Sequence, residues 1–186
     1  MKSFKLLLAL SLSILMFSGF SFGDSDDERR AERLAESKEA LELLYKEEPQ
    51  TIEQIKNAYG YATFKNYSMS MMMSIEGGTG LAHNSQTGKV TYMNMGSSGI
   101  GIGFGAKEFM AVFIFDNKKV YDDFVEDGWE ANFQADASAQ SDQDGESVND
   151  TYTVQKGVKL YKLTKTGLAM QINMHGSKYW KCRDLN

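Results

Sequence analysis

The stretch GIGIGFGAKEFMAVFIF, residues 99–115, decides the fold of this chain. In its first half, glycine occupies every second position and apolar residues stand between the glycines. Because side chains alternate between the two faces of a strand, this half predicts a strand with one bare face and one apolar face. Glycine weakens a strand, so the pattern indicates that another layer approaches closely or that the sheet bends sharply. The structural glycines are Gly99, Gly101, Gly103 and Gly105.

The second half, residues 109–115, is apolar at every position, which predicts a strand buried on both faces. A short helix is expected to follow, with Asp116 as its N-terminal cap and Gly128 at its end. Valine, tyrosine and phenylalanine form one apolar stripe along it, so this helix packs on the domain.

Two further helices are predicted before the strands. Residues 25–48 are highly charged with a sparse apolar stripe, which indicates an amphipathic helix that packs on the domain. Thr51–Gln54 has the pattern of a capping box that opens a second, short helix, and Gly60 ends it. The stripe consists of Leu34, Leu41, Leu44 and Tyr45 in the first helix, and of Ile52, Ile55 and Tyr59 in the second.

From Tyr61 onward the pattern is that of short strands with a hairpin loop at 84–88, and residues 137–151 form an exposed acidic loop. Further strands are predicted at 152–163, 167–174 and 178–181. We therefore expect an α+β fold, in which two N-terminal helices pack on a curved, mostly antiparallel β-sheet that is barrel-like or sandwich-like.

The N-terminus has the three regions of a secretory signal. Lys2 and Lys5 precede an apolar core, Leu6–Phe17, and small residues lead to Gly23. The apolar core is short for a membrane span, and a retained anchor is the alternative. The predicted organisation is a signal peptide over 1–23, a charged helix over 24–50 and one domain over 51–186. The protein is thus expected to be exported and periplasmic or secreted.

Charge is unevenly distributed. Residues 24–150 carry 11 lysines and arginines against 24 carboxylates, a net charge of −13, whereas residues 151–186 carry 7 against 1, a net charge of +6. If the basic residues converge on one surface, they attract anionic headgroups; the alternative is that they keep strand edges solvated. The overall acidity argues against nucleic acid as a partner. The candidate lipid-binding residues are Lys156, Lys159, Lys162, Lys165, Lys178, Lys181 and Arg183.

Residues that carry catalytic chemistry are sparse. The two histidines, His83 and His175, belong to no metal-ligand spacing, and the serines form no nucleophile motif. Cys182 has no second cysteine to pair with and no accompanying histidine or carboxylate motif. We therefore expect no catalytic residues, no resident metal and no cofactor, and we do not expect an enzyme.

Methionines are frequent. Met69, Met71 and Met73 share one face of a strand-like run, and Met93 and Met95 repeat the spacing. Thioethers bind Cu(I), so a copper site is one interpretation. The favoured interpretation is that methionine fills irregular core space left by the glycines.

The order of five segments resembles the SYLF domain family. These are AYGYATF, GGTGLAHNSQTGKVTYM, GIGIGFGAKEFMAVFIF, GWEANFQADASA and, as in an exported bacterial branch, the closing GVKLYKLTKTGLAMQINMHGSKYWKCRDLN. The resemblance covers residues 51–186 and departs at NYSMSMMMSIEGG, where methionines replace small residues. It implies a lipid-binding domain of the phospholipid or phosphoinositide type, in a family also labelled actin-binding after its yeast members.

Three functional classes remain open from the sequence. The first is a lipid-binding protein of the bacterial cell envelope, whose partner is an anionic phospholipid membrane surface. The second is a structural or protein-interaction domain that contacts an unidentified envelope protein. The third is a copper-handling protein that uses methionine and histidine.

Overall fold

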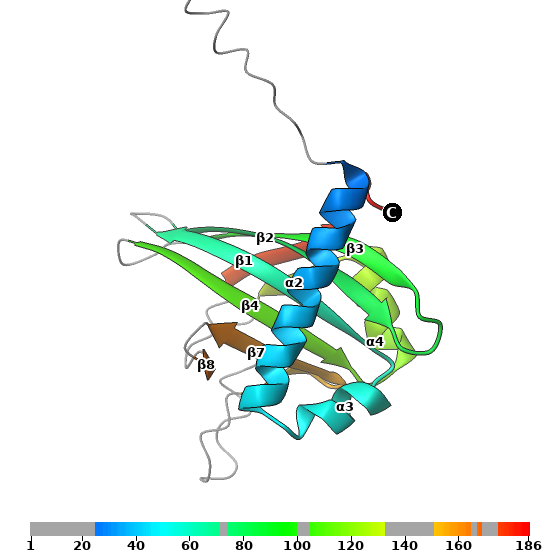
Figure 1. Ribbon diagram of the computed structural model, residues 1–186. Coiled ribbons are helices and arrows are strands. Elements are labelled where there is room, and N and C mark those ends of the chain that lie inside the picture. The colour runs from blue at the N-terminus through cyan, green and yellow to red at the C-terminus, as the bar shows by residue number, and fades with distance from the viewer. Residues whose placement is uncertain (1–24, 71–73, 100–104, 133–150, 165–166, 169–174) are drawn as a thin grey trace, which may run out of the picture.

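The computed structural model describes residues 25–70, 74–99, 105–132, 151–164, 167–168 and 175–186 (Figure 1). The helical elements are α2 (Asp26–Glu47), α3 (Thr51–Asn57), α4 (Lys118–Asp122) and the π-helical turn η1 (Asp123–Asp127). The strands are β1 (Gly60–Ser70), β2 (Ser74–Asn84), β3 (Val90–Gly99), β4 (Gly105–Phe115), β5 (Trp129–Asn132), β6 (Thr151–Gln155), β7 (Val158–Thr164), β8 (Gly167–Leu168) and β9 (His175–Lys181).

The strands form one sheet in the order β5-β9-β3-β2-β1-β4-β7-β6, with β8 paired to β7. Every strand pair in the described residues is antiparallel. The predicted α+β class and the antiparallel sheet are confirmed. The hairpin loop at 84–88 is confirmed too, since the Asn84 side chain accepts hydrogen bonds from the backbone N–H groups of Gln86 and Thr87.

The sheet curls around one of its faces. Strands β9 and β4 are four steps apart in the sheet order, which is about 19 Å for a flat sheet. Nevertheless the rings of Tyr179 on β9 and Phe113 on β4 lie only 5.3 Å apart. We call this concave side the inner face and the opposite side the outer face.

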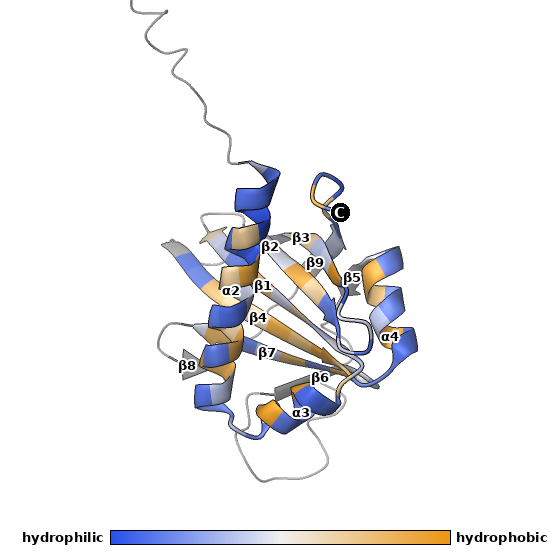
Figure 2. Cartoon of the chain, turned by 45° about the vertical axis from the view of Figure 1, so that its right-hand side comes forward, coloured by the Kyte–Doolittle hydropathy of each residue, from blue (hydrophilic) through white to orange (hydrophobic). Residues whose placement is uncertain are grey.

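Helices cover both faces (Figure 2). The inner face is closed by α4 and η1, whose Tyr121 and Phe124 join the aromatic core. The outer face is covered by α2 and α3, which bury Leu44 and Ile55 against β4 and β7. Strand β4 is therefore buried on both faces, as predicted, because Phe113 and Phe115 point inward while Met110, Val112 and Ile114 point outward.

Glycine is required at positions other than the four predicted, because a second group there lies too close for a side chain. A Cβ atom at Gly60 would lie 2.5 Å from the Tyr121 ring, and one at Gly78 would overlap the Asn66 amide. Gly99 is the last residue of β3 and Gly105 the first of β4, whereas Gly101 and Gly103 lie outside the described residues.

The helix caps differ from the sequence prediction. The capping box is at Ser25 and Glu28, at the start of α2. The helix α3 has no side-chain cap; the Thr51 hydroxyl instead donates to the Glu48 carbonyl. The cap of α4 is Asn117 rather than Asp116, because the Asn117 side chain accepts from the Val120 N–H.

The buried helix stripes are also shifted. Arg33, not Leu34, faces the sheet in α2, because its guanidinium donates to the Met93 carbonyl at 2.7 Å and to the Asn94 side chain. In α3, Ile52 is exposed although the predicted stripe includes it. The predicted strand 152–163 is a hairpin, since Gly157 at φ +87° turns the chain between β6 and β7. The predicted strand 167–174 overlaps β8, and residues 169–174 lie outside the described part.

Candidate functional site

The described basic residues of the C-terminal stretch do not converge on one surface. Lys159 and Lys162 lie on β7, and Lys178 and Lys181 lie on β9, with β3, β2, β1 and β4 between the two strands. Lys156 is in the turn before β7, and Arg183 follows β9. Lys165 lies outside the described residues.

These basic residues also differ in their surroundings. The Lys159 ammonium donates to the Gln54 side chain on the outer face at 3.3 Å, and Lys181 forms an ion pair with Glu126. Lys162 extends over the inner face, where its ammonium lies 3.8 Å from the centre of the Phe109 ring. The exposed members are Lys156, Lys178 and Arg183.

A second surface feature is an apolar patch near the far ends of β1 and β2. Tyr67 is 54% exposed, Met69 62% and Ile75 61%. We call these three residues the strand-end patch. They line a shallow groove of about 450 Å³ that also has Lys107 and Glu108 on its wall.

The strand register explains why this patch is uncovered. Met69 pairs with Ile75 and Tyr67 pairs with Gly77, so all three apolar side chains share the outer face. The helix α2 crosses that face only as far as Lys65, which bonds Glu36 of α2 at 3.3 Å. Beyond α2 the strands β1, β2 and β4 extend freely to the left in Figure 1.

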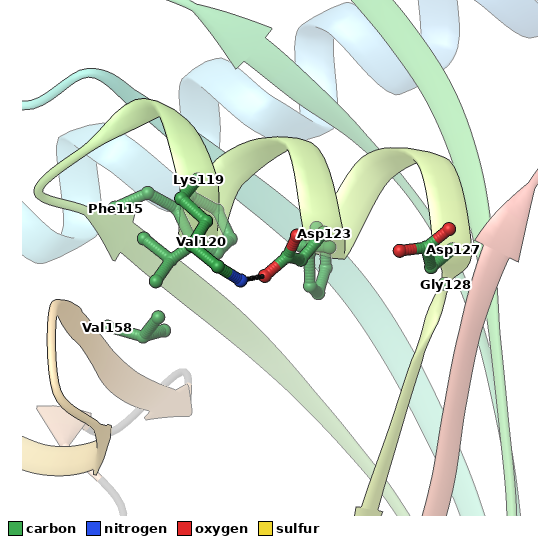
Figure 3. A pocket seen from close by; sticks show the side chains of 8 residues that line it. Phe115, Lys119, Val120, Asp123, Asp127, Gly128 and Val158 are labelled. Atoms are coloured by element: carbon green, nitrogen blue, oxygen red, sulfur yellow. Dashed lines mark hydrogen bonds and ion pairs between the residues drawn. The ribbon is translucent and has the colours of Figure 1, made fainter.

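A third feature is a pocket of about 370 Å³ beside α4 and η1 (Figure 3). Phe115, Val120 and Val158 form its apolar wall. Two of its charged groups are paired with each other, since Lys119 bonds Asp123 across one helical turn at 2.5 Å. Asp122 and Asp123 form exposed helical ion pairs with Lys118 and Lys119, and this pocket lacks a reactive arrangement.

The fourth feature is a group of polar side chains on the inner face, which we call the inner polar cluster. Its members come from β1, β2, β7 and β9, and the ring of one of them, Tyr179, also belongs to the aromatic core: Asn66, Glu76, Lys162, Ser177 and Tyr179. Asn66, Ser177 and Tyr179 are fully buried. Among the described residues, their side-chain amide and hydroxyl groups have no hydrogen-bond partner.

The two charges of this cluster influence each other. Burial raises the pKa of Glu76, and the positive charge of Lys162 partly offsets that rise. Burial lowers the pKa of Lys162, while the carboxylate of Glu76 acts in the opposite direction. Burial also raises the pKa of the Tyr179 hydroxyl, with Glu76 as a further cause, so this group stays a neutral donor.

The strand-end patch, Asn66 and Glu76 are not among the residues predicted from the sequence. Met93 and Met95 fill the core as predicted, but Met69 is exposed, so the core-filling interpretation is wrong for this residue. The alternation of polar and apolar residues over 66–69 was the sequence feature that indicated these positions. Met71 and Met73 lie outside the described residues.

The remaining candidates do not form a reactive site in the described part of the chain. His83 stacks on the Tyr61 ring with 5.0 Å between centroids, and burial lowers its pKa. Cys182 is buried. In the described residues, no three histidine, cysteine, aspartate or glutamate side chains gather in a way that would hold a metal ion.

Comparison with known proteins places this chain beside one characterised relative. It is 37% identical over 146 residues to Beta cell expansion factor A of Aeromonas veronii, a match that covers 78% of this chain and 54% of the relative. The chain thus spans about half the length of that protein. No model of a known protein family matches the chain. Among the described helices, none is both long enough and apolar enough to cross a bilayer.

Proposed function

We propose that this chain is an exported, non-enzymatic lipid-binding protein of the SYLF type that attaches to membranes through the strand-end patch. The single observation that carries the proposal is the exposure of three large apolar side chains, Tyr67, Met69 and Ile75, that share the outer face beyond the part covered by α2. Large apolar side chains that gather on a surface mark contact with a partner or a membrane. The family resemblance of residues 51–186 favours the membrane.

The charges beside the patch favour apolar insertion over electrostatic attraction. Lys65 bonds Glu36 at 3.3 Å and lies 3.9 Å from Glu108, so this cation is balanced by carboxylates, and Lys107 is the cation on the wall of the groove. The described C-terminal basic residues are divided between β7 and β9. Burying the exposed half of a large apolar side chain contributes about 1 kcal/mol, so three such residues support weak and reversible attachment.

Vesicle co-sedimentation of the full chain tests the proposal. Replacing Met69 and Ile75 together by serine should reduce the bound fraction at least several-fold, because the inserted apolar area is lost. Leu34 and Ile52 are matched controls, since they are 46% and 47% exposed on α2 and α3, away from the patch. Serine at these two positions should leave binding unchanged.

Salt and lipid charge separate the two attachment modes. Insertion predicts similar binding to neutral and anionic vesicles and little loss as salt rises. If binding is lost in salt and in a K159Q/K162Q/K178Q variant, the basic residues attach the protein instead. If no vesicle is bound, the second candidate function, a protein-interaction domain that uses the same patch, is favoured.

A further inference from the structure

Another exposed side chain, Trp180 on β9, is on the same side of the sheet as the strand-end patch. Trp180 is 41% exposed and pairs with Asn94 of β3, whereas its neighbour Tyr179 belongs to the aromatic core of the inner face. Because successive side chains of a strand point to opposite faces, the Trp180 side chain is on the outer face. Its six-membered ring lies over Gly96, where a Cβ atom would be only 3.1 Å from the ring carbon Cη2. The ring therefore extends along β3 toward the strand-end patch.

Two glycines leave the sheet bare between Trp180 and the strand-end patch. Gly96 pairs with Gly77 of β2, and Gly77 pairs with Tyr67 of β1. A Cβ atom at Gly77 would have nothing within 4 Å, so the space above this residue is open. Gly77 and Tyr67 both line the groove of about 450 Å³. In this row of the described sheet only glycine stands between the two aromatic side chains, so Trp180 and the strand-end patch form one continuous surface.

This surface changes in polarity along the strands. Lys65, which bonds Glu36 of α2 at 3.3 Å, comes first on β1. Tyr67 follows two residues later, and Met69 two residues after that; each step advances about 7 Å along the strand. On β2, Ile75 pairs with Met69 and is at the same level. From α2 toward the strand ends, the order is therefore charged, aromatic and aliphatic.

The same order of polarity occurs across the interface of a lipid bilayer. Tryptophan and tyrosine gather at the level of the headgroups, and aliphatic side chains lie in the hydrocarbon below them. The two sides of the aromatic row carry Glu108, which pairs with Tyr67, and Lys178, which pairs with Gly96. Both signs of charge are compatible with zwitterionic headgroups, and a long lysine side chain keeps its ammonium in the polar layer. The gradient thus favours a membrane as the partner of this surface.

The helix α2 prevents flat contact between the outer face and a membrane. An α-helix with its side chains is about 10 Å thick, and α2 lies on this face beside the surface. Its solvent side is charged, since the side chains of Lys38 and Glu42 are 79% and 66% exposed. A bilayer parallel to the sheet would meet these charges before it reached Met69 or Ile75. Contact therefore requires an oblique approach in which the strand ends lead.

We propose that the protein enters the bilayer with the far ends of β1 and β2 first, with Tyr67 and Trp180 at the headgroup level and Met69 and Ile75 in the hydrocarbon. Trp180 is then a second aromatic anchor, supplied by β9, which is three steps from β1 in the sheet order. Its indole N–H and the Tyr67 hydroxyl remain in the polar layer, where both find hydrogen-bond partners. This inference rests on the membrane attachment proposed above and adds its direction and depth.

Spin-labelled lipids measure the depth of each side chain in the unaltered protein. The protein is bound to phosphatidylcholine bicelles that carry a nitroxide either at the headgroup or near the end of the acyl chain, and NMR records the line broadening. The headgroup label should broaden the Trp180 indole N–H more than the Met69 methyl, and the chain label should reverse this order. The Ile52 methyl groups on α3, at the opposite end of the sheet, should be broadened by neither label.

Two substitutions change vesicle binding in opposite directions. W180A should weaken binding about three- to tenfold through loss of the indole contact, and W180F, which retains an aromatic ring, should weaken it less. G77L places an apolar side chain in the open space between Tyr67 and Trp180, so it should strengthen binding about threefold or more. I52S on α3 is the matched control and should leave binding unchanged. Circular dichroism verifies that each variant is folded.

Three results would overturn the orientation while vesicle binding persists. The first is the same ratio of broadening by the two labels at Trp180 and Met69, and the second is broadening of Ile52 as strong as that of Met69, which indicates flat contact. The third is weaker binding of G77L, which would show that the groove accommodates a specific partner instead. Absence of binding to any vesicle or bicelle contradicts the membrane attachment itself, and the orientation with it.

Discussion

The two ends of strand β1 have different surroundings. Toward Gly60, the strand is sealed on both faces, by the aromatic core with α4 on the inner side and by α2 and α3 on the outer side. Toward Ser70, the inner side carries the polar Asn66 and the outer side the exposed Tyr67 and Met69. The first end provides stability, and the second end has unsatisfied groups on both faces. The proposed binding function therefore lies at the second end.

The sharpest test of this contrast is the removal of one aromatic ring near each end of β1: Phe113 on the neighbouring strand β4 and Tyr67 on β1 itself. Phe113 is fully buried and contacts Phe64, Phe115, Phe124 and Tyr179. F113A should lower the free energy of unfolding by about 3–5 kcal/mol because it leaves a cavity in the aromatic core. Y67A should change it by less than about 0.5 kcal/mol. Urea denaturation measures both, and equal losses would contradict the contrast.

Alanine substitution of two glycines, one at each end of the sheet, tests the same contrast with smaller expected changes in stability. G60A places a Cβ atom 2.5 Å from the Tyr121 ring and 2.7 Å from the His83 carbonyl oxygen, so it should cost about 1–3 kcal/mol through overpacking. G77A meets nothing within 4 Å at the other end of the sheet. It should leave stability unchanged or raise it by less than about 1 kcal/mol, since alanine restricts the unfolded chain. Thermal unfolding compares the pair.

The smallest expected effect concerns pH and Glu76. Burial raises the pKa of Glu76 in the folded state above its ordinary value of 4.5. The folded protein thus binds the proton more tightly than the unfolded chain does. This carboxyl therefore costs stability once it ionises, and the cost grows as the pH rises from 4.5 through the folded-state pKa.

The variant E76Q removes this cost. Its stability relative to the unaltered protein should be higher at pH 7 than at pH 4, as measured by urea denaturation at both values. E39Q, which changes an exposed carboxylate of α2, is the control variant. A constant difference between E76Q and the unaltered protein would mean that Glu76 is as well solvated as in the unfolded chain.

Much of the fold followed from local pattern. The apolar run at 109–115 could only be a strand buried on both faces, and β4 has that environment. The long charged helix and the hairpin at 84–88 were likewise encoded in neighbouring residues. The predictions were wrong where a contact with a residue far away in the chain determines the burial of a side chain. Arg33 is buried because it reaches the carbonyl oxygen of Met93, 60 residues away in the chain.

The candidate sites were less predictable for the same reason. Seven basic residues close together in sequence suggested one surface, but the sheet order places four strands between β7 and β9. Met69 was assigned to the core because methionine usually fills one, whereas its exposure depends on where α2 stops crossing the outer face.

The sequence by itself determined the α+β class and the antiparallel pairing, because these depend on periodicity and backbone sterics. Only the tertiary structure decided which residues meet. The curl of the sheet brings Tyr179 to the aromatic core and puts Glu76 and Lys162 within electrostatic reach across two strands. Period-two alternation specifies a face for each side chain, but it contains no information on how strongly the sheet bends or how far a helix covers it.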